Sequence, residues 1–424
     1  MGSSCKGVAL LINYEKLNRH SFNALVGAIE TQESLDELPI YFSRNNDELK
    51  TQTQKLVKRF GKVILAFSLM TCQVVEVERI VSLLKKHCGS KVLLIAGGPH
   101  PTGDPVGTLK MGFDIIVRGE GEEVFLDLIK KILSKSDYSS LRGIAFSRNR
   151  NYVLNSRSRK IDINNYPPFA IKHNKFGPIE ISRGCPWTCL YCQTPFLFGT
   201  KVRHRSVSNV CKWIITMKKM KPLDIRFVSP NAFMYGSKDG KSVNVDKIEE
   251  LLKSVRQVLW SDGRIFFGTF PSEVRPESVT NETVELVTKY CDNDNLVIGA
   301  QSGSDRILER ICRGHGVNEV RQAVELTLDS GLKANVDFIF GLPDEKEEDT
   351  ILTLNLVKEL ASIGARIHAH TFMPLPGTPF KNMPPGKIRP EIKREMERLI
   401  SVGKLYGQWH TQEKIAESYK REYV

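Results

Sequence analysis

The sequence contains no long apolar segment. None of its 424 residues belongs to a stretch that approaches the roughly 20 apolar residues needed for a membrane-spanning helix. The longest apolar runs, such as residues 63–67 and 92–96, have the length of a buried strand. The N-terminus also lacks the basic, apolar and small-residue succession of a secretory signal peptide. We therefore expect a cytoplasmic protein without membrane attachment.

Cysteine is sparse and unevenly distributed. Nine cysteines in 424 residues are too few for a disulfide-stabilised scaffold. Six of them are isolated in the sequence, and isolated cysteines are usually small buried side chains. The other three fall close together in the middle of the chain: Cys185, Cys189 and Cys192. This distribution directs attention to one short segment.

Acidic residues are outnumbered by basic ones, 48 against 61, which gives a formal net charge of +13. Such a balance can indicate an RNA partner. No basic run with interleaved aromatic residues is present, however. A solvated, lysine-rich surface is the favoured interpretation, although the charge does not exclude a nucleic-acid partner.

Near-continuous apolar strands alternate with helical patterns over the first third of the chain. The expected strands occupy residues 6–14, 38–44, 62–70, 91–98 and 113–119. Apolar strands separated by helices predict a parallel sheet covered on both faces. We therefore expect an α/β fold that begins with a doubly wound, Rossmann-like domain over residues 1–139. Its ligands would bind at the carboxyl ends of the strands.

A second alternation begins after a connector. Residues 140–176 contain a small hairpin that turns at 148–151, followed by polar sequence. The next expected strands occupy residues 178–182, 224–229, 264–270, 296–301, 334–340 and 366–372. Six strand–helix units predict a partial (β/α)₆ barrel over residues 177–380, because a complete eight-unit barrel needs about 250 residues. Residues 381–424 are expected to form a helical C-terminal extension.

The three clustered cysteines follow the first barrel strand with the spacing C-x₃-C-x₂-C. Three thiolates can hold three irons of a four-iron cluster and leave the fourth iron open to a chelating ligand. A zinc site would need a fourth ligand, such as His204 or Cys211. A redox Cys-x-x-Cys pair would leave Cys185 unused. The spacing, the position after a strand and the aromatic Tyr191 before the third cysteine favour the iron–sulfur site.

Residues 177–380 resemble the radical S-adenosylmethionine (SAM) superfamily, which carries an aromatic residue before its third cysteine. The similarity is strongest to the branch shared by methylthiotransferases and cobalamin-dependent enzymes. It rests on Q-S-G-S-D within residues 298–316, G-L-P within 341–345 and P-G-T within 374–380. The resemblance implies a 4Fe-4S cluster on the three cysteines and SAM beside it. The implied SAM contacts are Tyr191, Glu273, Arg275, Gln301, Ser302, Ser304, Gly341 and Pro343.

These residue types suit SAM. Glu273 can accept from the SAM ammonium or a ribose hydroxyl, and Arg275 can pair with the SAM carboxylate. A local salt bridge on the barrel rim is the alternative interpretation of both. Asp337 and His370 also end barrel strands, where we expect satisfied polar side chains.

The first domain resembles the cobalamin-binding domain that precedes a radical SAM barrel in that branch. Residues 96–105 and 117–125 carry the resemblance. The implied cobalamin contacts are Ser68, Thr71, Gly97, Gly98, Pro99, His100, Gly119 and Glu120. The motif D-x-H-x-x-G, whose histidine ligates cobalt, is absent, so the resemblance implies no lower ligand. A degenerate domain that binds nothing is the alternative.

The resemblance as a whole is to archaeal cobalamin-binding radical SAM proteins, akin to the glutamine C-methyltransferase of methyl-coenzyme M reductase. It implies a C-methyltransferase that uses a 5′-deoxyadenosyl radical and methylcobalamin on an unactivated carbon, with a protein or peptide side chain as substrate. An external electron donor of ferredoxin or flavodoxin type would be needed. Two alternatives remain: a non-methylating cyclase or rearrangement enzyme, and a tRNA methylthiotransferase-like enzyme. The last normally carries a second three-cysteine cluster, whereas Cys5, Cys72 and Cys88 are widely spaced.

Overall fold

The computed structural model describes residues 7–218 and 223–423. Contacts between residues divide the chain into two compact units. The first consists of the chain up to Gly177 with Leu375–Gly377, and the second of Pro178–Pro374 and Thr378–Glu422. Within the described ranges, no helix is both long enough and apolar enough to cross a membrane.

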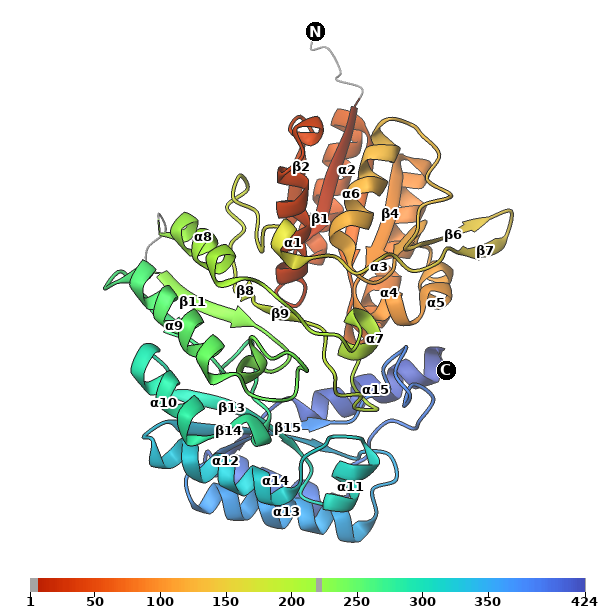
Figure 1. The fold of residues 1–424 in the computed structure, drawn as a ribbon. Coiled ribbons are helices and arrows are strands. Elements are labelled where there is room, and N and C mark those ends of the chain that lie inside the picture. The colour runs from red at the N-terminus through yellow and green to blue at the C-terminus, as the bar shows by residue number, and fades with distance from the viewer. Residues whose placement is uncertain (1–6, 219–222, 424) are drawn as a thin grey trace. The chain divides into compact units, whose positions relative to one another are not determined.

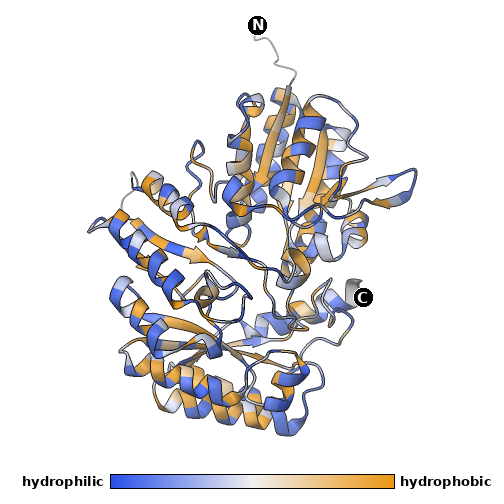
Figure 2. Ribbon diagram, viewed as in Figure 1, coloured by the Kyte–Doolittle hydropathy of each residue, from blue (hydrophilic) through white to orange (hydrophobic). Residues whose placement is uncertain are grey.

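The first unit is built on one seven-stranded sheet with the order β2-β1-β3-β4-β5-β6-β7. Its five parallel strands are β1 (Gly7–Asn13), β2 (Ile40–Ser43), β3 (Gly61–Ser68), β4 (Val92–Gly97) and β5 (Ile115–Val117). The order 2-1-3-4-5 is that of a doubly wound fold. The expected fold class is therefore confirmed for this unit. The last six residues of β3 are all buried, which explains its unbroken apolar run (Figure 2).

Helices cover both faces of this sheet (Figure 1). Helices α1 (Arg19–Glu30) and α6 (Gly121–Leu133) contact each other, as do α2 (Asn46–Phe60) and α3 (Val74–Cys88). The short helices α4 (Pro99–Gly103) and α5 (Pro105–Lys110) follow β4. The antiparallel hairpin of β6 (Ile144–Arg148) and β7 (Asn151–Leu154) continues the sheet beyond β5. The segment expected to be a connector thus supplies two strands to the first unit.

The second unit contains parallel strands that follow one another in chain order. One sheet has the order β12-β11-β8 and another has the order β13-β14-β15-β16. The isolated parallel bridge between Val274 and Ile298 lies between the two sheets. The strands are β8 (Ile179–Glu180), β11 (Leu223–Val228), β12 (Gly263–Phe266), β13 (Asn295–Gln301), β14 (Lys333–Phe340), β15 (Arg366–Thr371) and β16 (Leu405–Tyr406). This is the expected partial barrel, which β16 extends from within the C-terminal segment expected to be helical.

Helices connect these strands, as a βα barrel requires. The main ones are α8 (Val207–Met217), α9 (Val245–Leu259), α10 (Asn281–Tyr290), α12 (Val317–Asp329), α13 (Glu347–Ser362), α14 (Pro390–Ser401) and α15 (Trp409–Tyr423). The shorter α7 (Thr194–Phe198) follows the cysteines, and α11 (Asp305–Arg310) follows β13. Strand β12 ends earlier than expected, because Gly268 takes a φ of +71° and interrupts the extended backbone. The helical C-terminal extension is confirmed in α14 and α15.

Candidate functional site

The three cysteines lie in a loop, residues 185–192, between β9 (Ser182–Arg183) and α7. We call it the cysteine loop. Cys189 is buried, and Cys185 and Cys192 are half-buried. The loop is held by backbone hydrogen bonds from Cys185 to Gly199 (3.1 Å) and from Leu190 to Ile311 (3.1 Å). The thiols are thus presented on a fixed loop that follows the first barrel strand.

Two glycines allow this loop to pack closely. Gly184 has a φ of +94°, and a Cβ there would lie 2.5 Å from the carbonyl oxygen of Lys201. Gly314 has a φ of +76°, and a Cβ there would lie 2.1 Å from the ring of Trp187. The guanidinium carbon of Arg275 lies 4.1 Å from the centroid of the same ring. Trp187 therefore connects the cysteine loop to the loop after α11.

Three polar side chains from different segments converge above Gly299 in β13. A Cβ at that glycine would lie 2.6 Å from Arg313 Nη2, 2.8 Å from Gln301 Nε2 and 3.2 Å from Glu273 Oε2. Gln301 has a φ of +76°, at the point where a β-bulge shifts the pairing of β13 with β14. Strained backbone of this kind is common at binding sites. The arrangement places two donors and one carboxylate within reach of a single zwitterionic ligand.

Arg313 links this group to the cysteine loop. Its Nη1 lies 3.9 Å from Cys189 Sγ, and its Nη2 donates to the carbonyl of Gly299 (2.7 Å). Burial by itself would lower the pKa of this guanidinium, but the neighbouring Tyr191, Cys189 and Glu273 raise it above its usual value. Among the described residues, its buried Nε has no hydrogen-bond partner. Burial raises the pKa of the Cys185 thiol to about 11 and also raises that of Cys192, so these thiols would release their protons on binding iron, as metal ligands must.

Glu273 is a half-buried carboxylate with no hydrogen bond to any residue in the described parts of the chain. Burial raises its pKa, Arg313 lowers it and Asp337 raises it. A carboxylate of this kind is ready to accept a hydrogen bond from a cationic ligand. The residues present therefore fit a cluster on three thiols with SAM beside it. Glu273 could hold the SAM ammonium, and Gln301 and Arg313 its carboxylate.

Arg275 forms a local salt bridge, which is the alternative interpretation of this residue. It is buried, pairs with Glu277 and donates to the carbonyl of Arg313. Glu277 also lies 3.2 Å from Nδ1 of His315, whose Nε2 contacts the carbonyl of Ala300. Arg275 thus contacts both the ring of Trp187 and the backbone of Arg313, and it holds these two segments together.

Ser302 and Ser304 are buried inside the unit. The hydroxyl of Ser302 lies 3.3 Å from that of Thr353, and Ser304 Oγ donates to Asp349 Oδ1 (2.6 Å). Ser304 also caps α11 by accepting from the Ile307 amide. The structure thus places both hydroxyls in contacts with α11 and α13, rather than in the group above Gly299.

The G-L-P turn, whose Gly341 and Pro343 are implied SAM contacts, is tightly packed. Gly341 has a φ of +72°, and a Cβ there would lie 2.7 Å from the Lys387 amide nitrogen. Its own amide donates to Glu345 Oε2 (2.9 Å). Pro343 is buried beside it. Tyr191 lies on the cysteine loop, where burial raises the pKa of its hydroxyl well above the usual value.

In the first unit, the expected cobalamin contacts gather at the carboxyl edge of the sheet. Ser68 ends β3, Gly97 ends β4, and Gly98 has a φ of +96°. A Cβ on Gly98 would lie 2.9 Å from both the Leu69 amide nitrogen and Ser68 Oγ. Gly119, with a φ of +86°, has nothing closer than 3.9 Å to a Cβ position. A glycine-lined edge with hydroxyls fits a bulky planar ligand.

The remaining members of this group have internal partners. His100 is buried with Nδ1 3.2 Å from Thr71 Oγ1, and burial lowers its pKa to about 4. Pro99 begins α4. Glu120 is buried and accepts from the Ile161 amide (3.2 Å). His100 is therefore a neutral interior histidine that fixes Thr71 at the sheet edge.

The zinc alternative for the cysteine loop finds no support in the second unit. His204 lies 2.8 Å from Ser182 Oγ and 3.1 Å from the Ser237 carbonyl. Among the described residues, the three cysteines are not part of any group whose ligand atoms all lie within 4.8 Å of one another. A single ion needs such a group, whereas a four-iron cluster binds each thiolate to a different iron.

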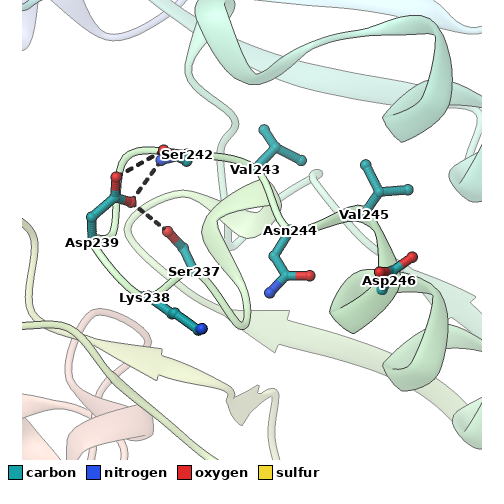
Figure 3. A pocket seen from close by; sticks show the side chains of 8 residues that line it. All are labelled: Ser237, Lys238, Asp239, Ser242, Val243, Asn244, Val245 and Asp246. Atoms are coloured by element: carbon teal, nitrogen blue, oxygen red, sulfur yellow. Dashed lines mark hydrogen bonds between the residues drawn. The ribbon is translucent and has the colours of Figure 1, made fainter.

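A hollow of about 410 Å³ lies beside the cysteine loop, along residues 237–246 (Figure 3). Figure 3 shows Asp239 hydrogen-bonded to Ser237 and Ser242. These bonds and the one from the Lys241 amide lower the pKa of Asp239. Lys241 Nζ lies 4.7 Å from the centroid of the Trp187 ring. The hollow thus has mixed walls that include Val243 and Val245, and the Asp239 carboxylate is occupied by bonds within its own loop.

Comparison with known proteins agrees with this architecture. Residues 179–357 match the model of the radical SAM superfamily, and residues 43–129 match that of the B12 binding domain. An uncharacterised methyltransferase of Pyrococcus horikoshii is 27% identical over 76% of this chain and 70% of its own length. A putative methylthiotransferase of Methanocaldococcus jannaschii is 26% identical over 66% of this chain and 61% of its own length.

Two solved structures share the fold. The radical SAM methyltransferase TsrM of Kitasatospora setae, solved with cobalamin and a [4Fe-4S] cluster, superposes with a TM-score of 0.69 at 15% identity. The match covers 88% of this chain and 73% of TsrM. The cobalamin-dependent radical SAM enzyme OxsB gives a TM-score of 0.64 at 17% identity, with 83% and 52% covered. The radical SAM domain implies a 4Fe-4S cluster and SAM, and the other domain implies cobalamin. The chain therefore combines a B12-binding domain, matched over residues 43–129, with a radical SAM domain, matched over residues 179–357.

Proposed function

We propose that the protein is a cobalamin-dependent radical SAM C-methyltransferase that acts on an unactivated carbon, with a protein or peptide side chain as its substrate. The observation that carries the proposal is the presence of two separate cofactor sites on one chain. One is the cysteine loop with Arg313 and Glu273, and the other is the glycine-lined edge of the first sheet. When bound, these cofactors supply a radical-forming site and a methyl carrier.

The residues of the second unit have distinct tasks in this proposal. Cys185, Cys189 and Cys192 bind three irons, and Arg313 compensates their negative charge. Glu273 and Gln301 orient the amino acid end of SAM through hydrogen bonds. Trp187 and Arg275 keep the cysteine loop in place.

The first unit would hold the methyl carrier by shape. Gly98 lets the end of β4 pack against Ser68 and Leu69, which shapes the edge of the sheet, and Ser68 and Thr71 would offer hydroxyls there. His100 is occupied by Thr71, which suits a positioning role and not cobalt ligation.

The test begins with anaerobic reconstitution and quantification of both cofactors. We expect about four irons and one cobalamin per chain, with the iron lost in Cys189→Ala. SAM and a reductant should then yield 5′-deoxyadenosine, and a peptide substrate should gain the mass of one methylene. Iron without cobalamin would refute the methyltransferase. Cofactor binding with a product of unchanged carbon count would indicate a cyclase or rearrangement enzyme instead.

Methylthiolation is a second candidate, because some relatives carry that name. The described part of the first unit contains Cys72 on an exposed turn and Cys88 at the end of α3. These two cysteines are the only ones in the described part of the first unit, and the length of α3 separates them, so no loop there presents three thiols together. A second cluster is therefore not favoured, and about four irons per chain would exclude it, since two clusters would give about eight.

A further inference from the structure

A second group of polar side chains lies on the inner strands of the barrel. Asp337 is in β14, and His368 and His370 are in β15. We call these three residues the barrel triad. Asp337 pairs in register with His368, and His370 is two residues further along the same strand. Residues two apart share one face of a strand, so both imidazoles and the carboxylate project from the same side. All three are half-buried, and their ligand-type atoms lie within 4.8 Å of one another.

Asp337 fixes the orientation of His368. Nδ1 of His368 lies 3.0 Å from Asp337 Oδ1. The carboxylate accepts, so Nδ1 carries a proton, and in the neutral ring Nε2 presents a lone pair. The ring is stacked on Tyr406, with centroids 4.6 Å apart and planes 7° from parallel. Within the described residues, Nε2 of His368 has no hydrogen-bond partner.

Gln412 fixes His370 in the opposite tautomer. Gln412 Oε1 accepts from the Thr371 amide (2.9 Å), so its Nε2 must face His370 Nδ1 (3.1 Å). An amide NH₂ only donates, and Nδ1 must therefore accept. Burial lowers the pKa of His370, which keeps the ring neutral near pH 7. The proton then sits on Nε2, which has no partner in the described parts of the chain.

The triad adjoins the cofactor group of the same unit. The charge of Asp337 raises the pKa of Glu273, whose carboxylate oxygen lies near Arg313 and Gln301 above Gly299. The carboxylates of Asp337 and Glu273 both lie near this place and disfavour an anionic ligand. Because His368 accepts and His370 donates, the pair also discriminates against a purely donating cation.

The residue types also suit a divalent metal ion. A histidine that binds metal almost always donates its other ring N–H to an acceptor. Gln412 does the reverse, because it turns its NH₂ toward His370. The surroundings of the triad therefore favour a hydrogen-bonding site over a metal site.

We propose that His368 and His370 form an acceptor–donor pair that binds a neutral substrate group able both to donate and to accept on one side, such as a hydroxyl or a primary carboxamide. Asp337 and Gln412 are positioning residues. A trans peptide bond does not qualify, because its N–H and C=O point in opposite directions. Only the statement that this group belongs to the methylated substrate rests on the proposed function.

The test uses ¹⁵N-histidine-labelled holoenzyme and long-range ¹H–¹⁵N NMR, with His368→Phe and His370→Phe to assign the signals. We expect the proton on Nδ1 of His368 and on Nε2 of His370. Four three-carbon probes are then compared: 1-propanol, propionamide, propionate and propylammonium. The first two should shift both Nε2 signals, and the charged pair should not. The response should vanish in His370→Phe and persist in His370→Gln, whose amide donates from nearly the same place.

A proton on Nδ1 of His370 would overturn the proposal. So would equal responses to charged and neutral probes, or no response to any. One Zn²⁺ bound per chain through both rings would replace it with a metal site. Propanol and propionamide acting separately would distinguish a hydroxyl from a carboxamide. None of these readouts needs SAM cleavage, so failure of the proposed function would appear as absent methyl transfer with unchanged spectra.

Discussion

The indole ring of Trp187 packs directly against the backbone of Gly314, which leaves no room for a side chain there. The first residue is on the cysteine loop and the second follows Arg313, which contacts Cys189. This contact joins the segment that binds iron to the segment that balances its charge.

Gly314→Ala should therefore impair iron retention. The new Cβ would lie 2.1 Å from the Trp187 ring on a backbone with φ of +76°. Gly331→Ala is the matched control, because its φ is +80° and nothing lies within 4 Å. Backbone strain alone costs about 1 kcal/mol in both variants. We expect iron loss on gel filtration only for Gly314→Ala; equal retention by both would show that the Trp187 contact is dispensable.

Cys189→Ala should abolish the iron–sulfur absorbance and SAM cleavage together. Cys189 is the buried member of the three and lies beside Arg313, so its replacement removes one of the three iron ligands. Cys211→Ala, on α8, should retain about four irons per chain. Similar iron contents in the two variants would contradict the assignment of the cysteine loop.

Glu273→Gln should weaken SAM binding while the cluster is retained. The variant keeps the shape of the side chain and removes a carboxylate that has no internal hydrogen bond among the described residues. A charge-assisted hydrogen bond is worth about 1.5–3 kcal/mol, which is about 10- to 100-fold in Kd. Equilibrium dialysis with labelled SAM measures this change. Glu285→Gln, exposed on α10, should leave Kd unchanged.

Gly98→Ala should reduce cobalamin binding. Its Cβ would meet Ser68 and Leu69 at 2.9 Å and force the β3 and β4 edges apart. Gly61→Ala has a similar φ of +84° with nothing within 4 Å, so it controls for backbone strain. We expect at least about a tenfold loss of affinity in spectrophotometric titrations, since a 1.4 kcal/mol loss corresponds to that factor. An unchanged affinity would move the cobalamin site away from this edge.

Glu345 should make stability depend on pH. Burial raises its pKa to about 7, although the hydrogen bond from the Gly341 amide acts to lower it. A carboxyl whose folded pKa is raised favours folding while it is neutral. That contribution is lost as the pH rises from about 4.5 through 7. Denaturation should show wild type losing about 1–3 kcal/mol relative to Glu345→Gln between pH 5 and pH 8. Parallel pH profiles would contradict this ionisation.

Local patterns were sufficient for the main elements of both units. The apolar runs of β1, β3 and β4 are long because helices cover both faces of the sheet, and this burial is visible in composition alone. The cysteine spacing also predicts its chemistry by itself, since it sets which thiols a single loop can present. The same reasoning placed Gly97 and Gly98 at the end of β4, where the structure has them.

Contacts between distant segments were not accessible in the same way. Arg313 and Trp187 were given no role from the sequence, although Arg313 lies within residues 298–316 and Trp187 lies between Cys185 and Cys189. Ser302 and Ser304 were assigned to SAM, but the register of α11 against α13 directs their hydroxyls to Thr353 and Asp349. Nothing local determines which residue of α13 a loop will meet.

The sequence by itself determined the strand–helix alternation, the thiol spacing and the glycines at the sheet edge, because these depend on neighbours along the chain. Only the tertiary structure decided that Glu273, Gln301 and Arg313 meet above Gly299, and that Asp337 and Gln412 hold His368 and His370 in opposite tautomers. Those meetings depend on the parallel register of β13, β14 and β15 and on the docking of α15, which bring together residues up to 75 positions apart.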